Sequence, residues 1–467
     1  MNIDWSSLWK KEDWWALWIS LIILILSIYS FFGWLPEVNI WINSSNIITT
    51  IFTQYNYLGI FSVFLLYIFT LFILSIGART MHINLRDFII GYTFIFFVSY
   101  FIWILGHYAY ISATPDLWNK LGIKGSLGLT CDIGYIFALI LGLLIANSIK
   151  NIPKSLQTAS NSFWYIKTGI ILLGISLGID LIKNFSFALN LIDKIFLFSL
   201  LYIFSAWTIS YFISKKLKLS KEESAVIASG STGTSLSSII VSSELFGVNP
   251  IIIGILYSII LIISSIELLI LPFIGYYLLN GYPIAAGSWV VSSIKTDCTS
   301  LTAGILESNL FSSNGWILYT STLSKIFIDF LLILWIFILS IIWNTRSKNK
   351  VSIIDLWYKM PKFIFGFFLI FLLTIILQKI FNLDLSTTYL QVETFMQFFF
   401  LLTFFSIGLS TNIRKIKDIK AKKLIFSFLI SLLIIIIVSL ILSIIIFGNI
   451  NLSGKIQTFN LLCQVYK

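Results

Sequence analysis

The sequence predicts an all-α polytopic membrane protein. Of its 467 residues, 58% are hydrophobic and only 11% are charged, whereas soluble domains are about half apolar and about a quarter charged. A water-soluble fold of this composition could not cover its surface with polar side chains. The apolar runs are continuous rather than alternating, which favours membrane-spanning helices over a β-barrel.

The candidate transmembrane helices follow from length, because a hydrocarbon core needs about 20 apolar residues per helix. Eleven runs qualify: 15–34, 57–77, 87–106, 131–149, 163–183, 190–213, 250–278, 316–342, 362–381, 392–411 and 424–447. Two further segments, 223–246 and 284–306, are long enough to cross but are rich in Ser, Thr and Gly. We therefore predict about 13 crossings, within two, in a transmembrane domain over residues 15–447.

The two ends of the chain are predicted to lie outside that domain. In the segment 1–14, Trp5, Leu8 and Trp9 share one helical face, which is typical of an interfacial helix with an aromatic belt. No small-residue cleavage pattern follows the first apolar run, so we expect this run to be a retained anchor. Residues 448–467 form a predicted C-terminal tail.

The basic residues predict the orientation. With the N-terminus in the cytoplasm, thirteen crossings place every strongly basic loop inside, as the positive-inside rule requires. These loops are 78–86, 150–162, 214–222, 343–361 and 412–423. The net charge of +11 is thus explained by membrane topology rather than by nucleic-acid binding. We expect a multi-pass protein of the bacterial plasma membrane with its C-terminus outside.

A weak internal repeat is visible. GISLGIDLIK at 174–183 aligns with SIGLSTNIRK at 406–415, in predicted spans that run in opposite directions, as inverted repeats and their broken helices require. Chance similarity between two Ile- and Leu-rich helix ends is the alternative. The two polar segments, 223–246 and 284–306, would run in the same direction, which means that one is re-entrant or that the repeat is permuted.

The first candidate site is the sequence ASGSTGTSLSS at 228–238. Its glycines permit unwinding, and its hydroxyls and free backbone N–H groups suit an anion. Close packing of small residues against a neighbouring helix is the alternative. The predicted substrate-binding residues here are Ser229, Ser231, Thr232, Thr234, Ser235 and Ser237.

The second candidate site is SSIKTDCTSLTAG at 292–304. Lys295 and Asp297 lie deep in an otherwise apolar segment, where ionisable groups are costly and usually functional. We expect Lys295, Thr299 and Ser300 to bind substrate, and Asp297 with Thr296 to serve the coupling ion. If the segment is misplaced, Lys295 instead lies near an interface.

Three other acidic or amide residues are weaker candidates. Asp180 and Asn412 end the repeated segments, where they could help to form the coupling-ion site or simply cap helices. Glu267, in the middle of 250–278, is either a proton site or the partner of a basic group elsewhere.

No enzymatic constellation is apparent. Walker-type, HExxH, GxSxG and paired-cysteine motifs are missing, and the two histidines, His82 and His107, are too few for a metal centre. We predict a non-enzyme without organic cofactor, catalytic residue or metal site, in which a proton or Na⁺ serves as coupling ion.

At these polar segments the chain resembles the bacterial YeiH-like sulfate exporter family, UPF0324. The resemblance lies in LWKKEDWWALWI at 8–19, ILLGISLGIDL at 171–181, STGTSLSS at 231–238 and FSIGLSTNIRKIK at 405–417. The chain departs from the family pattern in two places. Leu236, Ser237 and Ser238 replace the usual I-C-G, and Lys-Thr-Asp-Cys-Thr at 295–299 replaces a histidine and an acid that some members carry.

The resemblance implies a secondary transporter, related to sodium/proton antiporter and bile-acid symporter folds, with broken helices that cross near the midplane. We therefore expect a carrier that exports sulfate or a sulfonate- or carboxylate-bearing solute by alternating access. Its partners would be the lipid bilayer and a small anion, with a homodimer as an option because related folds often pair. The alternatives are a Na⁺-coupled importer of organic anions, an ion channel and an integral-membrane transferase.

Overall fold

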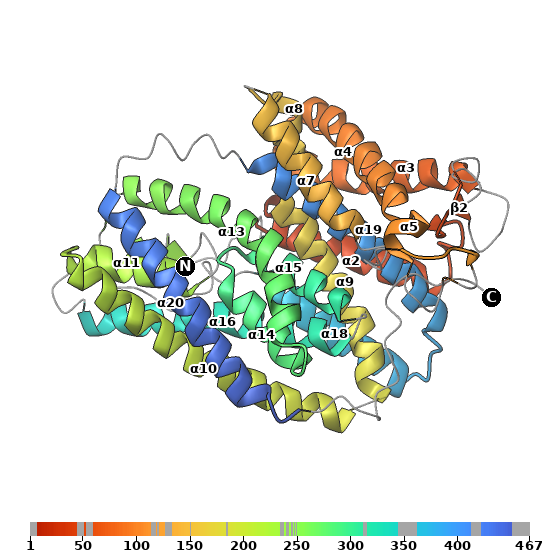
Figure 1. Ribbon diagram of the computed structural model, residues 1–467. Coiled ribbons are helices and arrows are strands. Elements are labelled where there is room, and N and C mark those ends of the chain that lie inside the picture. Colours follow the sequence, from red (N-terminus) through yellow and green to blue (C-terminus); the bar gives the residue numbers. More distant parts are fainter. Residues whose placement is uncertain are drawn as a thin grey trace. The chain divides into compact units, whose positions relative to one another are not determined.

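The computed structural model is built almost entirely from helices (Figure 1). It describes residues 7–43, 51–52, 59–113, 118, 121–126, 133–149, 151–183, 185–233, 238–239, 242–243, 246, 248, 250–311, 315–343, 362–411 and 422–450. Within this part, the strands form one small antiparallel sheet, in which β1 (Glu37–Val38) pairs with β2 (Ile51–Phe52). The predicted all-α class is confirmed.

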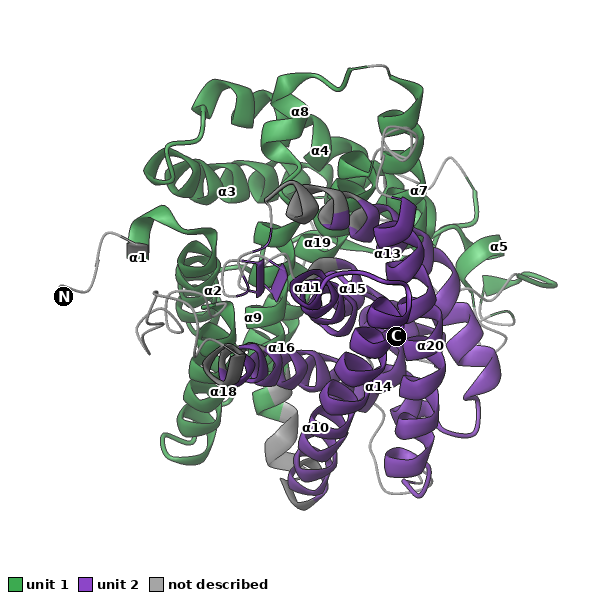
Figure 2. Ribbon diagram, turned by 90° about the vertical axis from the view of Figure 1, so that its left-hand side faces the viewer, with its two compact units in different colours: residues 1–185, 362–411, 460–467 green, residues 186–361, 412–459 purple. Residues whose placement is uncertain are grey.

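The chain divides into two compact units, coloured separately in Figure 2. Unit 1 comprises residues 1–185, 362–411 and 460–467, and unit 2 comprises residues 186–361 and 412–459. Over the described residues, six helices are long and apolar enough to cross a membrane. Large apolar side chains such as Phe72 and Leu433 are exposed on them, as lipid-facing surfaces require.

Besides the small β1–β2 sheet, the described part of unit 1 is built from helices. These are α1 (Ser7–Lys10), α2 (Glu12–Ile28), α3 (Gly59–Thr80), α4 (Leu85–Gly106), α5 (Ala109–Ser112), α7 (Ile133–Ser148), α8 (Lys154–Ala159), α9 (Ser162–Lys183), α18 (Phe363–Lys379) and α19 (Ser386–Ser410). The described part of the predicted interfacial segment 1–14 forms α1 and the start of α2. Trp9 stacks on Trp18 of α2 with 5.4 Å between ring centroids.

Helix α9 carries the first segment of the predicted repeat, and α19 carries residues 406–410 of the second. A β-carbon on Gly169 would lie 2.5 Å from the ring of Phe400, and the Ser410 hydroxyl donates to the Ser160 carbonyl over 3.2 Å. The start of α9 therefore meets the end of α19, so the two helices pack antiparallel. This agrees with the opposite directions that an inverted repeat requires, although the repeat itself stays a prediction.

Unit 2 contains both polar segments that the sequence singled out. Its helices are α10 (Phe185–Lys216), α11 (Lys221–Thr232), α13 (Pro250–Leu278), α14 (Pro283–Ser293), α15 (Asp297–Leu310), α16 (Gly315–Trp343) and α20 (Lys422–Phe447). We call the described residues of 221–248 hairpin 1, and residues 283–310 hairpin 2.

Hairpin 1 turns back on itself after α11. A β-carbon on Gly230 would lie 3.1 Å from Cγ1 of Ile239, and the Ser238 hydroxyl donates to the Ser229 carbonyl over 3.4 Å. In a continuous helix, residues nine positions apart are separated by about 13 Å. Ser238 and Ile239 therefore lie back against α11, which one continuous helix over 223–246 would not allow.

Hairpin 2 reverses between α14 and α15. A β-carbon on Gly304 would lie 3.3 Å from Cγ1 of Val291, although a continuous helix would separate these residues by about 20 Å. The side chains of Glu307 and Trp289 both reach Gly275 of α13. The turn of the hairpin is Ile294–Thr296, between the two arms.

The two hairpins enter from opposite ends of α10. Hairpin 1 begins just after α10 ends at Lys216. Hairpin 2 lies at the start of α16, because a β-carbon on Gly287 would be 2.7 Å from the Ile317 carbonyl oxygen. The start of α16 lies in turn beside the start of α10, where the rings of Trp316 and Phe187 are 4.8 Å apart.

Neither 223–246 nor 284–306 is therefore one continuous helix, as a simple crossing would require. The sequence allows for one re-entrant segment or a permuted repeat, and whether these segments are re-entrant in the membrane stays a prediction. Without them, eleven of the predicted spans remain, which lies within the predicted range of two. The number of crossings itself stays a prediction.

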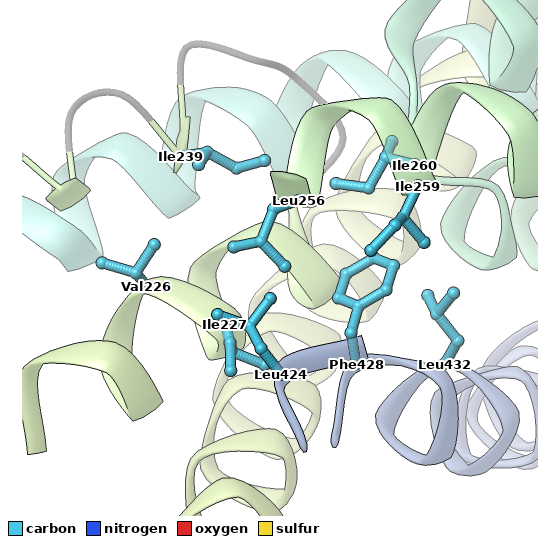
Figure 3. Packing of buried hydrophobic residues seen from close by; sticks show 9 residues of the cluster. All are labelled: Val226, Ile227, Ile239, Leu256, Ile259, Ile260, Leu424, Phe428 and Leu432. Atoms are coloured by element: carbon cyan, nitrogen blue, oxygen red, sulfur yellow. The ribbon is translucent and has the colours of Figure 1, made fainter. Parts of the chain in front are cut away.

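Hydrophobic packing fixes the base of hairpin 1 (Figure 3). Side chains from α11, α13 and α20 interlock there with Ile239 of the second arm. The fully or nearly buried cluster comprises Val226, Ile227, Ile239, Leu256, Ile259, Ile260, Leu424, Phe428 and Leu432. Since lipid tails are as apolar as these side chains, close van der Waals packing is what stabilises such a contact within a bilayer.

Candidate functional site

The tips of both hairpins meet at Tyr202, near the middle of α10. The Tyr202 hydroxyl lies 2.7 Å from the Ser292 carbonyl of hairpin 2 and 3.2 Å from the Thr232 carbonyl of hairpin 1. A hydroxyl has one proton, so it donates to one of these carbonyls at a time. Lys295 Nζ donates to the same hydroxyl over 2.8 Å. Tyr202 thus links the two hairpins within unit 2.

The tip of hairpin 1 depends on how α11 begins and ends. Ser220 caps its start with a capping box, in which the Ser220 hydroxyl accepts from Glu223 N–H and the Glu223 carboxylate accepts from Ser220 N–H. The helix stops at Gly233, whose N–H donates to the Ser229 carbonyl over 2.9 Å. A β-carbon here would lie 2.0 Å from Cδ2 of Leu332, so a larger residue at this position would require Leu332 to move.

The tip of hairpin 2 is shaped by Thr296. Its hydroxyl accepts from Thr299 N–H over 3.3 Å and caps the start of α15. The hydroxyls of Thr296 and Thr299 also hydrogen-bond to each other. The N-terminal N–H groups of α15 and two buried hydroxyls therefore lie at the turn, an arrangement that favours negative charge.

Lys295 is almost fully buried at this turn, with 1% of its surface exposed. Besides Tyr202, its ammonium contacts the Ser292 carbonyl at the end of α14, where the helix dipole favours a cation. It also lies 5.5 Å from the centroid of the Tyr202 ring. These contacts orient the amine. Among the described side chains, no carboxylate lies within ion-pair distance of it.

Three more buried ionisable side chains lie near mid-helix in unit 2. Together with Lys295 they are Glu267 of α13, and Lys325 and Asp329 of α16. Lys325 pairs with Asp329 one turn further along, with 3.5 Å between Nζ and Oδ1. All four are at most 8% exposed, and their formal charges cancel. Such groups are rare in membrane helices and usually mark a transport path.

The structure brings together most of the predicted site residues that it describes. Ser229, Ser231 and Thr232 end α11. Lys295 and Thr296 lie in the turn of hairpin 2, and Thr299 and Ser300 lie in the first turn of α15. Ser229 and Ser231 are committed to local bonds, since their hydroxyls donate to the carbonyls of Ala225 and Ala228. The Thr232 hydroxyl is buried without a hydrogen-bond partner among the described atoms, so it is free to contact a ligand.

The remaining predicted residues are not brought into this cluster. Thr234, Ser235, Ser237 and Asn412 lie outside the described residues. Asp297 begins α15 and Asp180 lies in the last turn of α9, in unit 1, but neither side chain is among those described. Their roles at a coupling-ion site stay predictions. The described residues contain no group of three or more His, Cys, Asp or Glu that could hold a metal ion.

Sequence reasoning missed Tyr202 and several other buried polar side chains of unit 2. Lys325, Asp329 and Glu307 are ionisable residues within apolar segments, and the rule that selected Lys295 could have found them. Glu307 is fully buried, and neither carboxyl oxygen has a hydrogen-bond partner in the described structure. Tyr202 carried no such signal, because tyrosine is common in membrane helices.

Comparison with known proteins agrees with the membrane assignment. The family model described as "Conserved hypothetical protein 698" matches residues 126–427. A UPF0324 membrane protein of Nitrosomonas europaea is 29% identical over 463 residues, covering 91% of this chain and 94% of the relative. A UPF0324 membrane protein of Nitratidesulfovibrio vulgaris is 24% identical over 73% of this chain and 56% of its own length. No solved structure matches the chain.

Proposed function

The chain belongs to the Conserved hypothetical protein 698 family of UPF0324 membrane proteins, and we propose that it is a secondary-active transporter of small anions. One observation carries the proposal: two re-entrant hairpins from opposite ends of α10 meet at Tyr202, beside the buried amine of Lys295.

Such a meeting point suits alternating access. Irregular backbone at membrane depth is tolerated where protein buries it or where it lines a cavity, and transporters place their substrate sites at such breaks. Because each hairpin reaches the site from its own end, movement of one hairpin would open the site to one side of the membrane. The Tyr202 proton, which two carbonyls share, would have a different partner in each state.

The chemistry of the site favours an anion. The buried Lys295 amine, the start of α15 and the hydroxyls of Thr296 and Thr299 are all donors or positive charges at one turn. Sulfate, or a sulfonate- or carboxylate-bearing solute, fits this set of donors. Export as the direction, driven by a proton or Na⁺ gradient, follows from the family resemblance alone.

The main alternative is a Na⁺-coupled importer of organic anions, which would use the same cation and hydroxyls. A requirement for Na⁺ and net inward flux would identify it. An ion channel is a weaker alternative, because its flux would be faster and would not saturate at low concentration. We further propose that the chain catalyses no reaction and resides in the bacterial plasma membrane with its N-terminus in the cytoplasm.

The test is counterflow of ³⁵S-sulfate in proteoliposomes, with Lys295→Gln compared with Lys154→Gln. Both variants lose one positive charge, but the side chain of Lys154 is 80% exposed. We expect saturable exchange by the wild type and by Lys154→Gln, and none by folded Lys295→Gln. Displacement of sulfate by other anions would identify the preferred substrate. Equal exchange by both variants would contradict the proposed site.

A further inference from the structure

Glu307 of hairpin 2 is a buried carboxyl that the transport proposal leaves unused. It lies in the last turn of α15, and 0% of its surface is exposed. Neither of its carboxyl oxygens has a hydrogen-bond partner among the described atoms. It also takes part in none of the ion pairs of the described residues. A negative charge on this group would therefore have neither a donor nor a cation beside it.

The Glu307 carboxyl packs directly on α13. A β-carbon on Gly275 would lie 2.3 Å from Oε1 of Glu307, 3.1 Å from its Cδ and 2.9 Å from Cζ3 of Trp289. Glycine at position 275 thus leaves the space that the carboxyl and the edge of the indole ring occupy. That ring is held in turn by α20, because its N–H donates to the Ile436 carbonyl over 3.0 Å. The carboxyl is enclosed where hairpin 2 meets α13.

Three of the helices at this place bring no counter-charge to the carboxyl. The charged residue of α13 is Glu267, which has the same sign and lies eight residues, or about 12 Å, before Gly275. Helix α14 contains no ionisable residue. Helix α20 is charged only at its start, at Lys422 and Lys423, about 20 Å before Ile436.

The charges of α16 are also distant from the carboxyl. A β-carbon on Gly304 would lie 2.5 Å from the Ser321 hydroxyl oxygen, and α15 ends beside the start of α16. Lys325 and Asp329 therefore lie about 10 Å or more beyond the level of the carboxyl, and they pair with each other. Tyr319 lies closer to that level, but a tyrosine is neutral near pH 7.

These surroundings determine the protonation state of Glu307. The other acid of α15 is Asp297, ten residues or about 15 Å away. An ionised Glu307 would therefore be an isolated charge in a low dielectric, which is strongly unfavourable. While hairpin 2 packs on α13 in this way, the Glu307 side chain is a neutral acid.

Water is nevertheless close to this contact. Gly275 lies one turn before α13 ends at Leu278, and Glu307 lies one turn before α15 ends at Leu310. Tyr277, at the same end of α13, is 84% exposed. A small movement of hairpin 2 away from α13 would therefore bring the carboxyl into water.

We propose that Glu307 exchanges a proton with water as hairpin 2 moves: it is a neutral acid while hairpin 2 packs on α13, and it releases its proton when hairpin 2 separates from α13. This inference rests on the proposed function, in which the hairpins move, and names the residue through which protons act on that movement. On separation, the carboxylic acid becomes a carboxylate and one proton enters water. The step balances in atoms and charge whatever the charge of the transported anion.

The proton makes the separation of hairpin 2 dependent on pH. A carboxyl in water is ionised above about pH 5, so the packed state binds one proton more than the separated state. Raising the pH therefore favours separation, by up to about tenfold per pH unit, and lowering the pH favours packing.

The experiment measures how fast a maleimide labels Ala303→Cys in the purified full-length protein, from about pH 6 to about pH 8, with the native cysteines replaced by serine. Ala303 lies one turn before Glu307 on the same face of α15 and is fully buried, so labelling requires hairpin 2 to move. Because thiol reactivity itself depends on pH, each rate is divided by the rate for the same cysteine in Glu307→Gln, whose side chain is permanently neutral.

We expect this ratio of rates to rise with pH, by up to about tenfold per pH unit. Glu393→Gln, a carboxyl-to-amide change in α19 at a side chain that is 7% exposed, should keep the wild-type pH dependence. A ratio that does not change with pH would overturn the inference. It would leave the transporter proposal intact, because sulfate counterflow tests that proposal separately.

Infrared spectroscopy provides a second measurement that needs no cysteine, and it decides if Ala303→Cys is not labelled at any pH. Near pH 7, we expect the wild type to show the carbonyl band of a protonated carboxyl, and Glu307→Gln to lose intensity in that band. Equal bands in the two proteins would overturn the inference. If Glu307→Gln does not fold, Glu307→Met, which is also neutral and of similar size, replaces it in both measurements.

Discussion

The buried lysines of the two units have different kinds of partner. In unit 1, Lys167 of α9 is satisfied by direct ion pairs, 2.5 Å to Glu12 and 2.6 Å to Asp13 at the start of α2. In unit 2, Lys295 lies in the turn of hairpin 2. Its amine donates to the Tyr202 hydroxyl and to the Ser292 carbonyl. The first lysine ties two helices together, whereas the second has no carboxylate within ion-pair distance among the described side chains.

We infer from this difference that Lys167 contributes mainly to stability and Lys295 mainly to transport. A fully paired charge at a helix start stabilises packing, and removing it leaves unpaired partners behind. A charge near mid-membrane without a close counter-charge is costly to keep, and is typical of a transport path. We therefore expect matched substitutions in the two units to affect different observables.

The largest effect should come from removing each lysine. Lys167→Met leaves the Glu12 and Asp13 carboxylates unpaired, and should reduce the free energy of unfolding by about 3 kcal/mol. Transport per folded molecule should not change. Lys295→Met should abolish sulfate exchange and should lower the melting temperature less than Lys167→Met does. Thermal unfolding in detergent and proteoliposome counterflow measure the two quantities, and a reversal of this pattern would invalidate the comparison.

A second effect concerns His107, which follows α4 in unit 1. Burial lowers its pKa to about 4 from 6.5, opposed by a hydrogen bond with the Trp103 carbonyl. The folded state therefore favours neutral His107. The free energy of unfolding should be highest above pH 6.5 and should fall as the pH drops from 6.5 towards 4. The loss should approach about 3 kcal/mol.

The pH dependence of the melting temperature checks this prediction. His107→Gln does not titrate, so its melting temperature should fall less steeply between pH 6.5 and 4 than that of the wild type. Parallel curves for the two proteins would show that protonation of His107 does not limit stability.

The smallest effect should come from removing a hydroxyl in each unit. Tyr165 of unit 1 donates to the Ala159 carbonyl over 2.7 Å, so Tyr165→Phe should cost about 1 kcal/mol of stability and leave transport unchanged. Tyr202→Phe unlinks both hairpin tips and should lower the exchange rate about tenfold, equivalent to about 1.4 kcal/mol. Equal transport rates for the two variants would show that Tyr202 is not part of the site.

Composition and hydropathy were enough to predict the helical membrane fold, and the cost of buried charge was enough to select Lys295. The hairpins could not be predicted in the same way. The crossing scheme and the hairpin scheme differ in the side of the membrane on which they place residues 247–249 and residues 279–282. Neither range contains Lys or Arg. The positive-inside rule therefore fits both schemes equally well. Only contacts between distant residues, such as Gly304 with Val291, distinguish them.

The position of Tyr202 could not be inferred from sequence for a related reason. Its role depends on two carbonyls, of Thr232 and Ser292, that are 30 and 90 residues away along the chain. A backbone carbonyl exists at every residue, so no residue type marks these partners. By contrast, Lys325 and Asp329 were visible as charged residues within an apolar run.

The most direct test of the account is the sidedness of the two hairpin bases. Single cysteines at Lys218, Val248 and Tyr282 would be labelled with a membrane-impermeant maleimide in intact and in permeabilised cells. The native cysteines, replaced by serine beforehand, are Cys131, Cys298 and Cys463. If both segments are hairpins, Val248→Cys labels from the same side as Lys218→Cys, and Tyr282→Cys labels from the other side. The reverse result, with Tyr282→Cys on the side of Lys218→Cys and Val248→Cys opposite, would mean that the segment 223–246 crosses the membrane and would contradict the proposed site.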